Sequence, residues 1–470
     1  MIHKRACMAL LFLMTFHQAA HSQGAAPALT LHSALSTAIA NDPWLLGSQH
    51  SQDSMDARST AAATLPDPRV SLGFANIPTD TFDFDQEAMS QFKVGLTQMF
   101  PRGDTRELQQ KQLAIESKKF PYERQNRIAN VTATVSELWL DTYKSRATGD
   151  LIQSNRGLFE QLVDVATLSY SAAVGRSRQQ DVIRAQLELT RIEDRLLVLQ
   201  QQFEMDSQRL REWLAHDLQQ RSAALVLPEK LPVLQLQNSQ SSPASIVLES
   251  LNQEQLLQHP AVLALEQQIE SASTGVSLAK QKYKPEWGLS ASYGYREDDP
   301  LSGGDRADFF SLGVSFDLPV FTTNRQDKEV RSAVSKAEAI RTRKWLLLRR
   351  LAAGMETSRA KLLRLESRQE LYDKRLLPQI REQADASLSA YTNDDGDFAE
   401  VVRARIAQLN TEIEALAIAV ERQKTIARLN YYLARGQVDT GESGAVTLAQ
   451  QLHWNNNSSN ATSAVRSNEY

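Results

Sequence analysis

The sequence predicts a mainly helical protein made of two similar halves, each with two β-strands and a long helical hairpin. Three observations support this fold class. The 470 residues include only 19 Gly, 15 Pro and 7% aromatic residues, which is unlike an all-β chain. Long segments carry apolar residues at alternating spacings of three and four, the pattern of helices that pack as coiled coils. Equivalent motifs recur in the same order roughly 220 residues apart, which indicates an internal tandem duplication.

The N-terminus has the features of a secretory signal peptide, which we expect to cover residues 1–22. Lys4 and Arg5 precede an apolar stretch from Ala6 to Phe16, and small residues follow it. A run this short cannot cross a ~30 Å hydrocarbon core as a helix, so the pattern favours export over a membrane anchor. The single cysteine, Cys7, lies inside this segment, so we expect neither disulfides nor a cysteine-based metal site in the exported chain.

Composition and motif content argue against several classes of protein. The net charge of −4 lacks the strong positive field of a nucleic-acid-binding protein, so no nucleic-acid partner is expected. The histidines are scattered without a helical i,i+4 pair, and no P-loop, dinucleotide-binding glycine pattern or nucleophile elbow occurs. We therefore expect no enzyme activity, no cofactor and no resident metal.

The duplication divides the chain into domains. Asn41-Asp42-Pro43 corresponds to Gln258-His259-Pro260, and Trp213-Leu214-Ala215 corresponds to Tyr432-Leu433-Ala434. We expect a first repeat over 23–216, a linker over 217–247, a second repeat over 248–436 and a C-terminal tail over 437–470. The linker is marked by Pro, Ser and Gln, and the Asn- and Ser-rich tail is expected to be largely disordered.

Each half contains two segments in which apolar residues alternate with small or polar ones. We expect strands at about 68–77 and 90–100 in the first half, and at about 286–296 and 309–319 in the second. Val70, Leu72 and Phe74, for example, alternate with Ser71 and Gly73. Segments this long approach the ~9–11 residues of a tilted membrane strand, although a half-buried strand of a soluble sheet alternates in the same way.

The rest of each half predicts a helical hairpin, with its turn near 170–181 in the first half and near 391–400 in the second. The first arm, from Pro101 to Gly175, would be about 110 Å long if it were wholly helical at ~1.5 Å per residue. Pro121 interrupts this arm, and it should either kink the helix or mark the point where a new helix starts.

These motifs, in this order and in duplicate, resemble the TolC-type outer-membrane efflux family over nearly the whole mature chain. The residues that carry the resemblance are Asn41-Asp42-Pro43, Leu65-Pro66-Asp67-Pro68, Gln98-Met99-Phe100-Pro101-Arg102-Gly103 and the two Tyr-x-x-x-x-Gly turns. The resemblance implies a homotrimer in the outer membrane, in which each chain gives four strands to a 12-stranded β-barrel that contacts lipid. It also implies that the hairpins of the three chains form a tapering coiled-coil tunnel in the periplasm.

The same resemblance implies that the hairpin turns form a periplasmic tip, which docks a membrane-fusion adaptor and narrows to a gate. The implied docking turns contain Tyr170, Val174, Gly175, Tyr391 and Gly396. The implied gate contains Asp181, Arg184, Glu400, Arg403, Asp394, Asp395 and Asp397. The chain departs from the family in placing Asp395 where the family has Val, and Arg403 where the family has an acidic residue.

The local spacing at the tip predicts two i,i+3 ion pairs, Asp181 with Arg184 and Glu400 with Arg403. A solvated helix turn with unremarkable charges is the alternative interpretation of the same residues. The loops at 79–90 and 297–308 are also acidic, which suggests a mouth that attracts cations, although exposed loop tips often carry charge.

The function that the resemblance implies is that of a passive exit duct in a tripartite efflux system. Its partners would be a periplasmic adaptor and an inner-membrane pump of the RND or ABC type, and its cargo metal cations or drugs. Within the same class, the chain could be the exit duct for type I protein secretion. The alternative from another class is a soluble periplasmic coiled-coil adaptor or scaffold with a small sheet.

Overall fold

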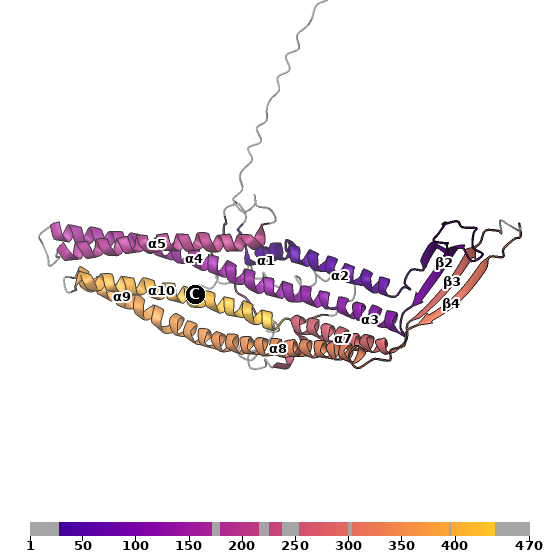
Figure 1. Cartoon of the computed structure of the whole chain (residues 1–470). Coiled ribbons are helices and arrows are strands. Elements are labelled where there is room, and N and C mark those ends of the chain that lie inside the picture. Colours follow the sequence, from indigo (N-terminus) through magenta and orange to yellow (C-terminus); the bar gives the residue numbers. More distant parts are fainter. Residues whose placement is uncertain are drawn as a thin grey trace, which may run out of the picture.

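The computed structural model describes residues 28–171, 179–215, 225–236, 253–298, 303–393 and 396–437. The expected signal peptide at 1–22, most of the expected linker at 217–247 and nearly all of the expected tail at 437–470 lie outside these residues. The described chain is an elongated rod of helices with a small sheet at one end and the two helical hairpin turns at the other (Figure 1). No described helix is both long enough and apolar enough to cross a bilayer.

The first half runs from two helices through two strands into a long hairpin. Its elements are α1 (Leu31–Ala40), α2 (Pro43–Ala62), β1 (Arg69–Ala75), β2 (Gln91–Phe100), α3 (Thr105–Ser117), α4 (Lys119–Ser171) and α5 (Gln179–Leu214). Helix α3 ends one residue before α4 begins, so Pro121 lies in the first turn of a new helix. The N–H groups of a first turn have no partner within the helix, so the proline costs no hydrogen bond there.

The second half repeats this order. Its elements are η2 (Gln253–Gln258), α7 (Pro260–Lys280), η3 (Gln281–Tyr283), β3 (Trp287–Tyr295), β4 (Phe309–Phe316), α8 (Gln326–Leu371), the π-helical turn η4 (Tyr372–Leu376), α9 (Leu377–Thr392) and α10 (Phe398–Tyr432). Strand β4 ends before the expected position 319, at Phe316. The next residue, Asp317, uses its carboxylate to accept the Glu286 N–H at 2.7 Å, and Pro319 has no N–H to donate.

The four strands form one antiparallel sheet in the order β1-β2-β3-β4. The register aligns Val70, Leu96, Ala291 and Leu312 in one row across the sheet, and it aligns Ser71, Gly95, Ser292 and Ser311 in the next row. Because side chains alternate along each strand, one face of the sheet is apolar and the other carries mainly small and polar residues. The apolar face is bare, and the Leu312 side chain is 76% exposed on it.

The helices form a single layer rather than a bundle around a central core. Near the sheet, neighbouring helices contact one another in the order α2, α3, α7, α8, and toward the turns in the order α5, α4, α10, α9 (Figure 1). One edge of the layer is therefore formed by α2 and α5, and the other by α8 and α9. These edges belong to the same halves as the two edge strands, β1 and β4.

The repeated Pro motif joins helices end to end. Asp42 caps α2 by accepting the Trp44 N–H at 3.1 Å, while the neighbouring Asn41 donates its amide to the Leu214 carbonyl at the end of α5, at 3.2 Å. In the second half, His259 Nδ1 accepts the Ala261 N–H at 3.3 Å, and Nε2 lies 3.1 Å from the carbonyl of Tyr431 near the end of α10. Each motif thus starts one helix and fastens it to the end of another.

Two main apolar clusters hold the layer together. The larger one lies at mid-rod, where Trp139, Leu140, Met355 and Leu429 are fully buried. Trp139 stacks on Tyr143 with ring centroids 5.6 Å apart. The second cluster lies near the hairpin turns and combines residues of both hairpins.

The His259 junction makes the stability of the fold depend on pH. Burial lowers the pKa of His259 from 6.5 to about 4, and protonation of Nδ1 would remove the acceptor that caps α7. The unfolded chain takes up the proton first, so the free energy of unfolding should fall as the pH drops from about 6.5 to about 4, by up to about 3 kcal/mol. Thermal unfolding followed by circular dichroism at both ends of this range measures the effect.

The variant His259→Asn keeps a cap acceptor but does not titrate, so it should lose most of this pH dependence. His50→Asn is the matched control, because the His50 side chain is 73% exposed. Equal pH dependence in the wild type and in His259→Asn would contradict the prediction.

Candidate functional site

One face of the helical layer is polar and hollowed along its length. Cavities of about 930, 620 and 390 Å³ lie along it. The residues of α3 and α4 that line them recur at helical spacing and therefore share one side of these helices. They include Thr105, Gln109, Gln112, Glu116, Glu123, Arg127, Asn130, Asp141, Ser145 and Thr148. We call this side of the layer the open face.

The opposite side of α4 is covered by two other segments of the chain. Trp139 Nε1 donates to the Leu29 carbonyl at 3.0 Å, and the Tyr143 hydroxyl donates to the Glu229 carbonyl at 2.8 Å. Arg146 donates to the carbonyl of Leu227 at 2.6 Å. The chain before α1 and the segment 225–236 therefore lie on this side, which we call the covered face. The layer thus has two chemically different faces.

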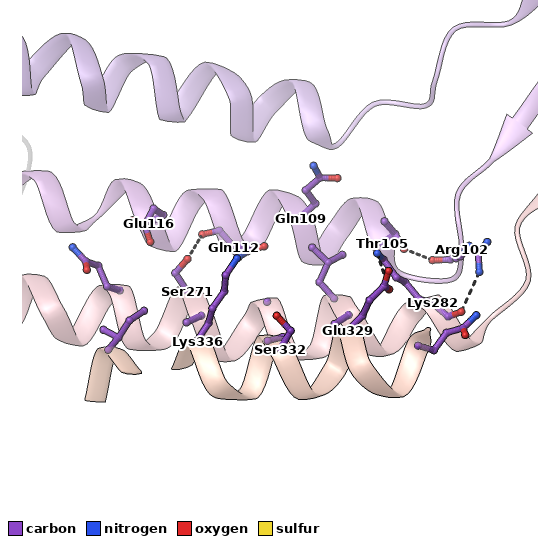
Figure 2. Close-up of a pocket in the computed structure, with 18 of the residues that line it drawn as sticks. Arg102, Thr105, Gln109, Gln112, Glu116, Ser271, Lys282, Glu329, Ser332 and Lys336 are labelled. Atoms are coloured by element: carbon purple, nitrogen blue, oxygen red, sulfur yellow. Dashed lines mark hydrogen bonds and ion pairs between the residues drawn. The ribbon is translucent and has the colours of Figure 1, made fainter. Parts of the chain in front are cut away.

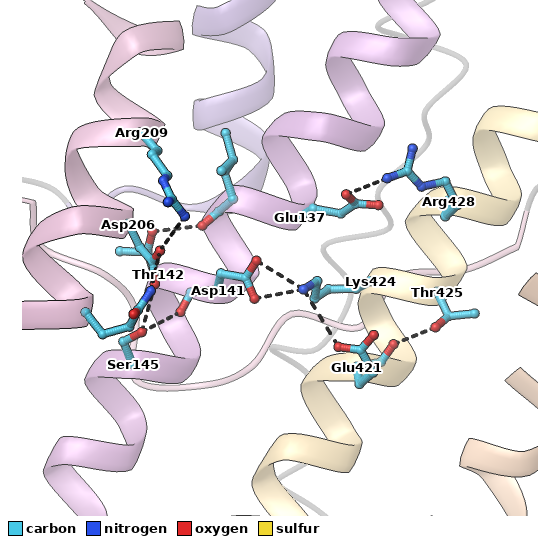
Figure 3. Close-up of polar contacts among 12 residues, drawn as sticks. Glu137, Asp141, Thr142, Ser145, Asp206, Arg209, Glu421, Lys424, Thr425 and Arg428 are labelled. Carbon is cyan, nitrogen blue, oxygen red and sulfur yellow. Dashed lines mark hydrogen bonds and ion pairs between the residues drawn. The ribbon is translucent and has the colours of Figure 1, made fainter. Parts of the chain in front are cut away.

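At mid-rod, ion pairs join the two halves of the chain. Lys424 of α10 donates to both carboxylate oxygens of Asp141 in α4, at 2.8 and 3.0 Å, and Arg428 donates to Glu137 at 2.7 Å (Figure 3). Burial raises the pKa of Glu137, although Arg428 and Lys424 oppose it. Burial disfavours the charge on Lys424, but its bond to Asp141 and the negative charges of Asp141, Glu421 and Glu137 together outweigh this and raise the pKa of the ammonium. These pairs fasten α4 to α10.

At the tip, the two hairpins share an apolar cluster. Phe398 begins α10 and is only 2% exposed, and its ring packs edge-on against Tyr391 with centroids 5.5 Å apart. Buried partners from the first hairpin include Phe159 and Ala185. Arg195 of α5 also donates to the Asn410 amide oxygen of α10 at 3.0 Å. The described ends of the two hairpins are therefore held together by packing as well as by polar contacts.

The structure places two of the expected gate residues, Asp181 and Glu400, in the first turns of α5 and α10. Asp181 is buried in the first turn of α5 and lies 3.9 Å from Arg184. Glu400 lies in the first turn of α10 and pairs with Arg403 at 2.7 Å. Asp397 caps α10 by accepting the Ala399 N–H at 3.2 Å. Asp394 and Asp395 lie outside the described residues.

Three of the expected docking residues are described. Tyr170 is exposed near the end of α4, while Tyr391 is half-buried against Phe398. A Cβ atom at Gly396 would lie 2.7 Å from the Tyr391 nitrogen, so only glycine fits this tight turn. Val174 and Gly175 lie outside the described residues.

Sequence reasoning missed Phe398 and the mid-rod ion pairs. The signal for Phe398 was a large aromatic residue directly after the acidic run of the second turn. Asp141 and Lys424 had no comparable local signal, because charged and polar residues are common along both helices. Across the described ranges, no group of three or more His, Cys, Asp or Glu side chains is arranged to hold a metal ion.

Removing the Phe398 ring should loosen the tip. Phe398→Ala leaves a cavity in a shared cluster, which costs ~3–5 kcal/mol for a buried Phe, and this loss should act on local opening of the turns. Hydrogen exchange of peptides covering 385–393 and 396–409 should become at least about tenfold faster. Phe82→Ala serves as the control, because Phe82 is 73% exposed in the β1–β2 loop. Unchanged exchange in Phe398→Ala would contradict a tip held by this cluster.

Comparison by sequence found no matching protein-family model and no matching curated protein. Comparison of structures found close likenesses. The outer-membrane channel OprN aligns with a TM-score of 0.71 at 16% identity, over 86% of this chain and 90% of that one. The outer membrane protein VceC of Vibrio cholerae aligns with a TM-score of 0.70 at 14% identity, over 86% and 96%. The Campylobacter jejuni outer-membrane channel CmeC aligns with a TM-score of 0.71 at 11% identity, over 90% and 89%.

These alignments span nearly all of the described rod and sheet, and nearly the whole length of each solved channel. They agree with the mainly helical architecture and the four-stranded antiparallel sheet found in this chain. The chain has the fold of the TolC-type outer-membrane channels.

Proposed function

We propose that the protein is an outer-membrane channel that serves as the passive exit duct of a tripartite efflux system. The observation that carries this proposal is the sheet. It has a bare apolar face and lies at one end of a helical rod whose open face is polar. The likeness to solved outer-membrane channels supports the same function.

The sheet needs both lipid and further strands. Its apolar face includes Leu72 and Phe310, each 68% exposed, which is costly in water and favourable against acyl chains. Four strands cannot close around water, and β1 and β4 each have one unpaired edge within the described chain. In a homotrimer, β4 of one copy pairs with β1 of the next, which gives a closed 12-stranded barrel with no free edge.

The helical layer closes in the same trimer. Exposed apolar residues on the edge helix α5, such as Ile183 and Leu187, become buried against α8 and α9 of the neighbouring copy. The covered face carries two extra segments, so it lies outside the tunnel. The open face then lines the lumen, where its polar side chains suit a water-filled passage.

The hairpin tip is the periplasmic end of this tunnel. It docks a membrane-fusion adaptor through the turns around Tyr170 and Tyr391, and it narrows to a gate at Asp181 and Glu400. An inner-membrane pump supplies the energy, and the duct itself conducts passively. The protein therefore resides in the outer membrane and extends into the periplasm.

Two neighbouring residues of β4 test the membrane embedding. Leu312 lies on the apolar face and Ser311 on the other, so Leu312→Lys should place a charge in lipid at a cost of ~2–4 kcal/mol, while Ser311→Lys should be tolerated. We expect Leu312→Lys to reduce the yield of heat-modifiable trimer extracted from the outer membrane by detergent, as measured by electrophoresis of unheated samples. Release of the wild type by osmotic shock alone would instead support a soluble periplasmic adaptor or scaffold.

The tip carboxylates test the gate. The double variant Asp181→Ala, Glu400→Ala removes the acidic partner of Arg184 and of Arg403, and it should loosen the turns. We expect a higher single-channel conductance of the purified protein in planar bilayers. The control is Asp164→Ala, Asp194→Ala, which removes two exposed carboxylates from the arms of the first hairpin. A conductance equal to that of the wild type would exclude Asp181 and Glu400 from the gate.

A further inference from the structure

The largest of these three cavities is a groove on the open face, next to the sheet. It has a volume of about 930 Å³, within the size range of small-molecule sites. Helix α7 forms its floor with small residues, including Ala272, Gly275 and Ala279, and α3 and α8 form its walls (Figure 2). The α3 wall contributes the uncharged polar residues Gln109 and Gln112. We call this cavity the α7 groove.

The α8 wall gives the α7 groove an excess of positive charge. Arg325, Lys336 and Arg343 line it, and within the described residues none of the three has a carboxylate within ion-pair distance. Lys336 extends across the groove toward Gln112 (Figure 2). Lys336 and Arg343 are exposed, so a ligand in the groove can reach both charges.

The acidic residues of the α7 groove are largely neutralised by other cations. Glu116 pairs with Lys119 at 2.8 Å, and Glu329 pairs with Lys282 at 2.8 Å. Glu286 is the one remaining carboxylate among the residues that line the groove. Three uncompensated cations therefore face one uncompensated carboxylate, and a concave wall of low polarity concentrates the resulting positive potential.

The apolar part of the groove restricts the kind of anion. Its floor and lower wall include Leu278, Ala333 and Ile340, which a fully hydrated inorganic ion cannot use. An apolar body placed on this floor would be removed from water while an acidic group at its end met Lys336 and Arg343. We propose that the α7 groove binds small amphiphilic anions, which have one carboxylate, sulfonate or phosphate group and an apolar body. If the protein is the proposed duct, these anions are a class of its cargo, and this role alone rests on the proposed function. Binding of the anions to the groove does not depend on it.

Binding can be measured without reference to conduction. The probe is naphthalene-2-sulfonate, titrated by isothermal calorimetry into the purified protein in zwitterionic nanodiscs at low salt, with empty nanodiscs as the blank. The reference ligand is 2-naphthylmethylammonium, which has the same apolar body and the opposite charge. We expect the sulfonate to bind at least about tenfold more tightly, since a hydrogen bond to a charged group contributes about that much. The difference should shrink as salt is added.

Matched variants locate the site. Lys336→Gln, Arg343→Gln should weaken sulfonate binding at least about tenfold. Lys111→Gln, Lys118→Gln removes two exposed cations at the same seven-residue spacing from α3 and its C-terminal end, and neither residue lines the groove. This control should bind within about twofold of the wild type, which is the spread expected for surface charges that do not touch the ligand. Equal binding by the two double variants, or equal binding of sulfonate and ammonium, would overturn the proposal.

A current measurement separates this proposal from the proposed function. In planar bilayers, naphthalene-2-sulfonate should reduce the current through the wild type more than through Lys336→Gln, Arg343→Gln. Charge-dependent binding by a protein that forms no channel would support the groove and contradict the duct. Channels with no charge-dependent binding would support the duct and contradict the groove.

Discussion

The structure depends on a sheet whose outer edges and apolar face both lack partners within the described chain. Its four strands leave two rows of unpaired backbone groups at β1 and β4, and its apolar face has nothing within the described chain to cover it. Both needs are met at once if identical sheets join edge to edge within lipid. Since β1 and β4 belong to the same halves as the helical edges at α2/α5 and α8/α9, closing the sheet also closes the layer of helices. The similar order of elements in the two halves of the chain provides these matched edges.

The two faces of the helical layer are stabilised by different interactions. The mid-rod cluster around Trp139 and the segment 225–236 gather on the covered side, where apolar burial stabilises the layer. The open face instead carries charges that are paired across helices, as in Asp141 with Lys424. Charge-assisted hydrogen bonds stabilise this face, and they persist in contact with water. The cations of the α7 groove differ from the rest of the face because they have no carboxylate partner within the described residues.

Much of the fold could be predicted from the sequence, because strands and helices leave periodic patterns. The mainly helical architecture and the four-stranded sheet are confirmed, and the position of Pro121 at the start of α4 follows from backbone chemistry. The lateral order of the helices in the layer could not be predicted, because nothing in the sequence of α7 shows that it lies between α3 and α8. The α7 groove and the Asp141–Lys424 pair depend on that order, so they could not be predicted from the sequence either. The roles of Asp181 and Glu400 in the gate stay predictions.

The end-to-end junctions at Asp42 and His259 have a geometric consequence. They join α5 to α2 and α10 to α7, while α3 is followed directly by α4, and α8 runs through η4 into α9. Each chain therefore has four long rods, equal in number to its strands. Packed helices stand ~8–10 Å apart and strands ~4.8 Å apart. Barrel strands tilt by ~35–45°, which increases the arc that each one takes up, so in a closed cylinder the four rods exceed the arc of the four strands by less than twofold. The connectors that follow Phe100 and Phe316 lie at this change of spacing, and their residues Pro101, Arg102 and Arg325 line the α7 groove.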